Sequence, residues 1–142
     1  MLAKLLLAFG LMALCVVIHA TGLMSIFRWM DMDMELVHPG HRSRHSAWRL
    51  IRVAGWTVLL HLFQILLWAI AYAGGGAMPD FTTAAYFSAV TYTTTGYGDL
   101  VLPADWRVVG GIEALTGILM CGLSAGMYFA VFSRFLGRNS AR

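Results

Sequence analysis

The sequence predicts an all-α membrane protein with three transmembrane helices and a re-entrant segment between the second and the third. Hydrophobic residues make up 59% of the 142 residues and charged residues only 12%, whereas about 25% are charged in a typical soluble domain. Three nearly uncharged stretches each exceed the roughly 20 apolar residues that a helix needs to cross the hydrocarbon core. These observations favour lipid over water as the surrounding solvent.

The three predicted spans cover residues 1–28, 48–73 and 106–136. The first holds Lys4 near its start, the second is uncharged from residue 53 onward, and the third carries Glu113 well inside it. The apolar character runs around each helix, which favours spanning over lying in the interface. Cys15 and Cys121 both fall in apolar spans, so we expect packing residues and no disulfide.

Basic residues indicate the orientation in the membrane. Eight of the ten Lys and Arg residues fall on one side of the predicted spans: Arg28, Arg42, Arg44, Arg49, Arg52, Arg134, Arg138 and Arg142. The positive-inside rule places the 29–47 linker and the 138–142 tail in the cytoplasm and the N-terminus outside. We therefore expect a multi-pass protein of the cell (plasma or inner) membrane. An alternative is that the first span is a signal peptide cleaved after Ala20.

Polar residues of the linker and of the second span have several interpretations. His38, His41 and His45 flank Pro39-Gly40, which breaks a helix and argues against converging metal ligands. A solvated basic linker is favoured, with a lipid-headgroup or pH-sensing role as the alternative. We expect His61 and Gln64 to form hydrogen bonds between helices in preference to binding a ligand.

The segment between the second and third spans contains a helix too short to cross the membrane. Residues 74–79 read GGGAMP, and a helix is predicted over residues 80–93. Pro79 suits a helix start, and the Asp80 carboxylate suits an N-cap. About three turns of helix are far shorter than the bilayer core.

The next residues, "TTTGYGD" at 93–99, predict non-helical backbone at membrane depth. Such backbone is tolerated only where protein buries it or water reaches it, so its carbonyls need partners. A partly dehydrated cation is one such partner. The C-terminal end of the short helix carries a partial negative charge and also favours a cation.

This run resembles the selectivity filter of potassium channels, Thr-Val-Gly-Tyr-Gly-Asp, with Thr95 at the position where valine is commonest. The resemblance covers a pore domain over residues 48–137, with outer helix 48–73, pore helix 80–93, filter 94–99 and inner helix 106–136. It implies a homotetramer that conducts potassium passively. It implies no enzymatic reaction and no cofactor besides the permeant ion.

The resemblance also implies roles for single residues. Potassium would bind the backbone carbonyls of Thr94, Thr95, Gly96 and Tyr97 and the hydroxyl of Thr94. Gly98 would complete the filter. The remaining implied residues are Asp99 at the outer mouth, Tyr86 and Phe87 as filter support, Gly117 as a hinge, and Ile118, Cys121, Ala125 and Phe129 as cavity or gate candidates.

Glu113 and the aspartates add charge to this region. Glu113 is an ionisable residue inside a span, which is costly and indicates a specific partner. It either supports the back of the filter, senses pH, or bonds to a neighbouring chain. Asp80, Asp99 and Asp105 are expected to make the outer vestibule acidic and to concentrate cations, although a cap or a loop charge is an equal interpretation for Asp80 and Asp105.

Three other functions stay open at this point. The first is a weakly selective cation channel. The second is a nucleotide- or phosphate-binding membrane protein, which the missing Gly-Lys-Ser/Thr ending of a P-loop disfavours. The third is an accessory membrane subunit without conduction of its own. The expected partners are other copies of the chain and membrane lipid, with no nucleic acid and no small-molecule substrate.

Overall fold

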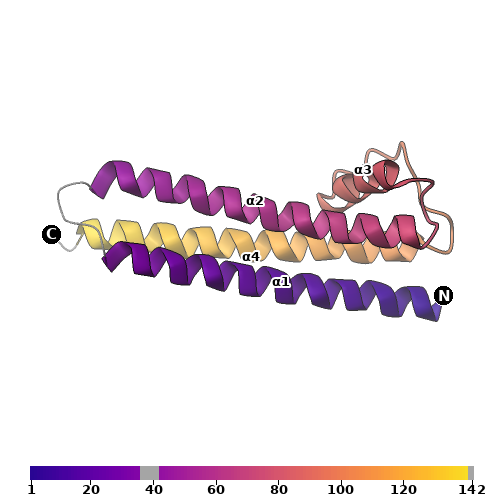
Figure 1. The fold of residues 1–142 in the computed structure, drawn as a ribbon, viewed down its shortest axis with the longest axis horizontal. Helices are drawn as coiled ribbons and strands as arrows, with labels where there is room; N and C mark the ends of the chain where they lie inside the picture. The colour runs from indigo at the N-terminus through magenta and orange to yellow at the C-terminus, as the bar shows by residue number, and fades with distance from the viewer. Residues whose placement is uncertain (36–41, 141–142) are drawn as a thin grey trace.

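The structure is a computed structural model that describes the backbone of residues 1–35 and 42–140. Four helices make up this part of the chain: α1 (Leu2–Glu35), α2 (Arg42–Gly74), α3 (Phe81–Tyr92) and α4 (Arg107–Ser140) (Figure 1). The described residues contain no strand. The prediction of an all-α fold is therefore confirmed.

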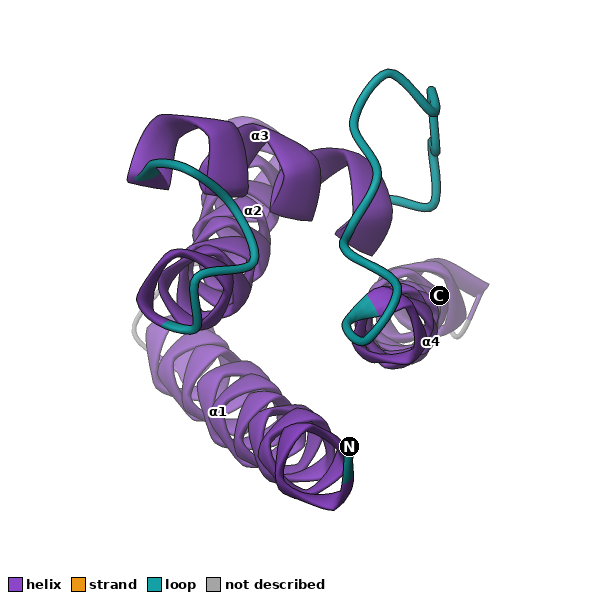
Figure 2. Ribbon diagram, turned by 90° about the vertical axis from the view of Figure 1, so that its right-hand side faces the viewer, coloured by secondary structure: helices purple, strands orange, loops and turns teal. Residues whose placement is uncertain are grey.

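Three long helices run side by side, and the short one lies at one end of them. The N-terminus of α1, the C-terminal end of α2 and the start of α4 share the end that carries α3 (Figure 1). Apolar spans of membrane-crossing length occupy Leu2–Trp29, Leu50–Gly74 and Arg107–Ser133. Viewed along the bundle, α3 lies across its end, and the loop after α3 rises on the side away from α1 (Figure 2).

The long helices extend beyond the predicted spans. α1 continues to Glu35 and α2 begins at Arg42, so much of the predicted 29–47 linker is helical. Residues 29–35 read WMDMDME, and Met and Glu are good helix formers. A helix does not have to end at the membrane surface, because its backbone hydrogen bonds are internal in water as well as in lipid. α4 likewise continues to Ser140.

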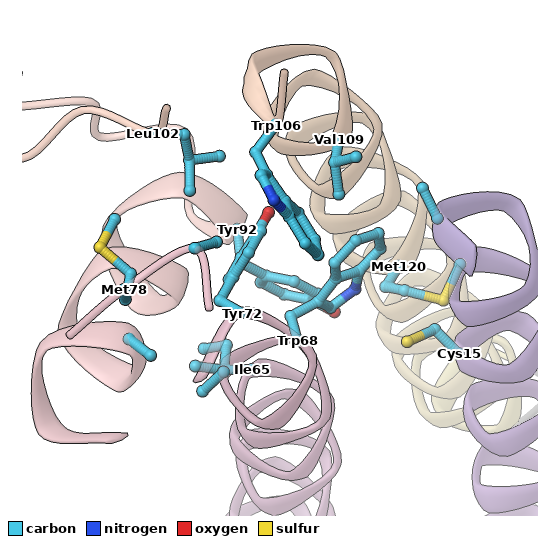
Figure 3. Close-up of a cluster of buried hydrophobic side chains, with 14 residues drawn as sticks. Cys15, Ile65, Trp68, Tyr72, Met78, Tyr92, Leu102, Trp106, Val109 and Met120 are labelled. Atoms are coloured by element: carbon cyan, nitrogen blue, oxygen red, sulfur yellow. The ribbon is translucent and has the colours of Figure 1, made fainter. Parts of the chain in front are cut away.

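An aromatic cluster fixes the end of the bundle that carries α3. The Tyr72 ring meets the Trp106 ring edge-on at 6.0 Å between centroids and the Phe87 ring at 5.4 Å. Trp68 lies 6.2 Å from Tyr72 on the same helix (Figure 3). A Cβ on Gly75 would overlap the Trp106 ring, so a glycine is needed there. The cluster ties α2, α3 and the start of α4 together.

A second apolar cluster lies at the opposite end of the bundle. It consists of Leu23 from α1, Val53 from α2, and Met127 and Val131 from α4, all of them buried. The two clusters are separated along the helices by a layer of buried polar side chains, which is described below.

Capping interactions define both ends of α3. The Asp80 carboxylate accepts hydrogen bonds from Thr83 N at 2.8 Å and from Thr83 Oγ1 at 2.7 Å. These bonds lower the pKa of Asp80 because they favour the charged form. At the other end, Thr93 N donates to Ala89 O at 3.2 Å. The expected N-cap at Asp80 is confirmed, and it sets where α3 begins.

Candidate functional site

The backbone after α3 alternates between two conformations. Thr94, Gly96 and Gly98 have φ angles of 59°, 56° and 78°, while Thr95 and Tyr97 between them stay outside the left-handed region. Glycine adopts positive φ at little cost, but a threonine does so only when its surroundings enforce it. An alternation of this kind aims successive peptide groups to the same side of the chain.

Backbone amides of this segment turn back toward the end of α3. Thr94 N donates to Thr91 O at 2.9 Å, and the amides of Thr95 and Gly96 both donate to Val90 O, at 3.0 and 3.3 Å. In a trans peptide the N–H and the preceding C=O point in opposite directions, and the described residues contain no cis bond. The carbonyls of Thr93, Thr94 and Thr95 therefore point away from α3.

These carbonyl oxygens have no hydrogen-bond donor within the part of the chain that the structure describes. Residues 93–99 are all exposed, and no protein donor reaches the carbonyls of residues 94–98. A row of oriented carbonyl dipoles at the end of a short helix carries partial negative charge. Such a row is suited to a cation and repels an anion.

The Thr95 hydroxyl forms a hydrogen bond with the side chain of Thr93. Thr93 Oγ1 donates to Ala89 O at 2.7 Å, which uses its own proton. Thr95 Oγ1 lies 2.9 Å from Thr93 Oγ1 and is therefore the donor of that pair. The extra oxygen compared with valine is held by a neighbouring side chain and not left unpaired.

Tyr86 and Phe87 have different contacts in the structure. Tyr86 OH donates to Asp99 Oδ2 at 2.7 Å, which joins α3 to the end of the Gly-Tyr-Gly segment. This bond raises the pKa of Tyr86, because loss of its proton next to a carboxylate is disfavoured. Phe87 packs inward against Tyr72. Tyr97 remains 72% exposed in the single chain.

Glu113 is buried and bonds to two side chains of its own chain. Tyr72 OH from α2 donates to Glu113 Oε2 at 2.7 Å. Ser88 Oγ from α3 is hydrogen-bonded to Glu113 Oε1 and also donates to Ile65 O at 2.8 Å. The single Ser88 proton serves one acceptor at a time, so the set is complete when the carboxyl carries a proton itself. Glu113 thus joins α2, α3 and α4 behind the carbonyl row.

Gly117 lies at a close contact between α4 and the end of α3. A Cβ on Gly117 would overlap the carbonyl oxygen of Tyr92. α4 runs without interruption through this position. The structure thus gives Gly117 a packing reason to be glycine, and its role as a hinge stays a prediction.

The cavity and gate candidates share one face of α4. Ile118 is 57% exposed and Phe129 is 74% exposed, and Cys121 and Ala125 are exposed as well. The buried face of α4 is a different stripe, formed by Val109, Glu113, Gly117, Met120, Ser124, Met127 and Val131. The four candidates therefore lie on a face that the chain's own helices leave uncovered.

Three aspartates at the end of the bundle that carries α3 each have a partner. Asp80 caps α3, Asp99 accepts from Tyr86, and Asp105 forms an ion pair with Lys4 of α1. Lys4 also lies 4.6 Å from the centre of the Trp106 ring. This pairing lowers the pKa of Asp105. Because Lys4 balances its charge, Asp105 adds less to an acidic vestibule than its sequence position suggests.

Sequence reasoning missed Tyr72 and Ser88 as partners of Glu113. A tyrosine and a serine in otherwise apolar helices were the available signal, but spacing along one chain does not show which helices meet. His61 and Gln64 were predicted to bond between helices, and both do. His38, His41 and His45 lie outside the residues whose side chains are described. Among the described residues, no group of three potential metal ligands gathers.

Comparisons with known proteins agree with this geometry. A family model described as "Ion channel" matches residues 52–134, which covers α3, the carbonyl row and most of α2 and α4. A stretch of 76 residues is 30% identical to the potassium voltage-gated channel protein Shal of Drosophila melanogaster. That stretch is 53% of this chain and only 13% of Shal, so the chain spans a small part of that relative. No solved structure matches the chain.

Proposed function

This chain belongs to the ion channel family, and on that premise we propose that it is a potassium-selective channel. It is a multi-pass membrane protein, and its described residues include three helices long and apolar enough to cross a membrane. In the proposed function, potassium ions move passively down their electrochemical gradient through a pore on the axis of a homotetramer. The protein performs no chemical reaction and uses no cofactor other than the ion that it conducts.

The orientation of the carbonyls at Thr94 and Thr95 is the observation that carries this proposal. Their peptide amides are held by Val90 O, so the oxygens point away from the protein with no donor among the described residues. One chain offers oxygens from a single side only. Four chains around an axis would surround an ion and replace its hydration shell.

The proposal gives each residue of the segment a role. The carbonyls of Thr94, Thr95, Gly96 and Tyr97 and the Thr94 hydroxyl bind potassium, and Gly98 allows the last turn of the backbone. Asp99, held by Tyr86, shapes the outer mouth. The exposed face of α4 with Ile118, Cys121, Ala125 and Phe129 lines the cavity or meets the neighbouring subunit, and Gly117 is a candidate hinge.

The proposed location is the cell membrane, with the N-terminus outside and the C-terminus in the cytoplasm. The C-terminal end of α1, the start of α2 and the C-terminal end of α4 lie at the same end of the bundle (Figure 1). Most Lys and Arg residues of the sequence fall at these positions. An excess of basic residues favours the cytoplasmic side.

The decisive experiment is ion flux into liposomes that contain the purified full chain. Potassium and sodium gradients are applied in opposite directions, and protein-free liposomes give the background. We expect a flux of potassium well above that of sodium. Native mass spectrometry of the same preparation is expected to show four chains per assembly.

Two other functions correspond to other outcomes of this experiment. Equal flux of the two ions would identify a weakly selective cation channel. No flux over a range of pH values would instead favour an accessory subunit that packs against a conducting partner. Either result would overturn the proposed potassium selectivity.

A further inference from the structure

A closed ring of five hydrogen-bonded side chains lies in the middle of the helix bundle. His19 of α1, His61 and Gln64 of α2, Tyr92 of α3 and Ser124 of α4 take part, so the ring contains at least one residue from each helix. His19 and Gln64 are fully buried, Tyr92 and Ser124 nearly so. The ring is the polar layer between the two apolar clusters of the bundle.

The orientation of the Gln64 amide sets the direction of every bond in the ring. Gln64 Nε2 lies 3.4 Å from Cys15 O, a carbonyl that only accepts. The amide nitrogen therefore faces α1 and donates to His19 Nδ1 at 3.0 Å. The amide oxygen faces the other way and accepts from Tyr92 OH at 2.6 Å.

These two bonds determine which atom is the donor in each of the other hydrogen bonds of the ring. His19 accepts at Nδ1, so its neutral ring donates from Nε2 to Ser124 Oγ at 2.9 Å. Ser124 then donates its own proton to His61 Nε2 at 3.1 Å. His61 carries its proton on Nδ1 and donates to the Tyr92 hydroxyl oxygen at 3.0 Å. Each of the five side chains donates once and accepts once around the ring.

A ring of this kind behaves as a unit. Hydrogen bonds that run in one direction polarise one another, and a buried polar group that loses its partner is costly. Replacing any member removes one ring bond from each of its two neighbours. The position of Tyr92 is therefore linked to the position of His19 through Gln64 on one side of the ring and through Ser124 and His61 on the other.

Tyr92 is also the residue that leads directly into the proposed filter. It is the last residue of α3 and precedes Thr94, the first residue with a positive φ angle, by two positions. Its carbonyl packs against Gly117 of α4, and its hydroxyl is held in the ring. Both ends of this residue are thus fixed by neighbouring helices.

We propose that α1 is a positioning element of the pore, and that His19 acts through the ring to hold the end of α3 where the filter begins. This inference rests on the proposed function of the filter. The matched residues of the ion channel family begin at position 52, so α1 lies outside them. Two of its polar contacts, the Lys4–Asp105 ion pair and the bond of His19 to the ring, involve parts of the chain that flank the proposed filter segment.

The test is the ratio of potassium to sodium permeability in liposomes, measured for the full chain and for ring variants. His19→Phe keeps a planar ring but removes both of its hydrogen bonds, and Tyr92→Phe removes the hydroxyl. Thr57→Val is the matched control, because Thr57 is equally buried on α2 but bonds only to Val53 O of its own helix. The ratio is a property of conducting channels and does not depend on how many channels fold.

We expect the ratio to fall about fivefold or more in each ring variant, the factor that corresponds to one typical hydrogen bond. The control is expected to keep the wild-type ratio. The double variant of His19 and Tyr92 is expected to lose no more than the worse single variant, since one opened ring cannot be opened again. Additive losses would mean that the two residues act independently, and would overturn the proposal.

A smaller change keeps the test decisive if His19→Phe does not assemble. Ser124→Ala opens the ring by removing one oxygen, and Ser124→Thr restores the hydroxyl. We expect the ratio to fall with alanine and to recover with threonine. A wild-type ratio in all ring variants, with only the yield of assembled protein reduced, would show that the ring merely holds the helices together. Failure of this inference can be distinguished from failure of the proposed function. In the second case the wild-type chain itself would not discriminate between potassium and sodium.

Discussion

At the scale of single residues, the segment after α3 stores backbone strain. Thr94 is the non-glycine residue with a positive φ angle in the described part of the chain, and this conformation costs roughly 1–2 kcal/mol for an L-residue. The amides of Thr94, Thr95 and Gly96 are each held by α3 carbonyls, which compensates for that cost. Strain that is maintained in this way is common where backbone atoms bind a ligand.

Replacing Gly96 with alanine tests whether this backbone conformation matters for conduction. The φ angle of 56° is unfavourable for alanine, so the Gly96 peptide is expected to rotate and move its carbonyl. We expect potassium flux in liposomes to fall about five- to thirtyfold, as a loss of roughly 1–2 kcal/mol implies. Gly76→Ala is the control, because Gly76 has a φ of 69° and equally open surroundings but lies outside the filter. Equal losses in both variants would contradict the prediction.

Substitutions of Glu113 test the hydrogen bonds that join α2, α3 and α4. Glu113→Gln keeps a neutral group that both donates and accepts, so Tyr72 and Ser88 retain partners. Glu113→Leu leaves the Tyr72 hydroxyl without its acceptor and leaves Ser88 bonded to Ile65 O alone. We expect this change to cost about 1–3 kcal/mol of unfolding free energy. Denaturation of the detergent-solubilised protein, followed by tryptophan fluorescence, measures the difference. An equally large loss with glutamine would show that the carboxylate charge is what matters.

At the scale of elements, α3 is fixed at three points along its length. Asp80 caps its start, Ser88 reaches Glu113 and Ile65 O in the middle, and Tyr92 packs on Gly117 at its end. Its partners come from both α2 and α4. A helix of 12 residues is only marginally stable by itself, so these contacts are what hold it across the end of the bundle.

The close contact between α3 and α4 predicts the effect of Gly117→Ala. The added methyl group would overlap the Tyr92 carbonyl, and the two helices would have to move apart. We expect a loss of about 1–3 kcal/mol in unfolding free energy, the usual cost of overpacking. The same denaturation assay applies, with Gly10→Ala on α1 as the control because its Cβ meets no atom. A stabilised Gly117→Ala variant would be inconsistent with the observed contact.

At the scale of the whole molecule, α1 packs against both α2 and α4 of its own chain. The ring joins it to the middle of the bundle, and Lys4 joins its first turn to Asp105 before α4. The large exposed apolar side chains of α2 and α4 lie on other faces. These faces are available to lipid and to the neighbouring subunits of the proposed tetramer.

The Lys4–Asp105 pair predicts a pH-dependent contribution to stability. The pKa of Asp105 is lowered in the folded protein, so the pair contributes above the unfolded value of about 4 and is lost as the pH falls through the folded value. We expect Lys4→Met to lower the thermal midpoint at neutral pH, with a gap to wild type that closes below about pH 4. Lys4→Arg should keep the wild-type midpoint. A gap that persists in acid would mean that the stem of Lys4, packed on Trp106, is responsible.

Much of this architecture follows from local sequence. The apolar stretches predict three spans, Asp80 predicts the start of α3, and the Thr-Gly-Tyr-Gly run predicts irregular backbone, because each depends on residues that are neighbours along the chain. Membership of the ion channel family also follows from this run and its two flanking spans.

Partners that are distant in sequence required the fold. His19 and Ser124 are separated by 105 positions, and Tyr72 and Glu113 by 41, and no pattern within one helix shows which face of another helix it will meet. A polar side chain in an apolar helix indicates that it has a hydrogen-bond partner, because burying it unpaired costs free energy. Which side chain fulfils that need depends on the rotation and crossing of the helices, and these arise from packing across the whole bundle.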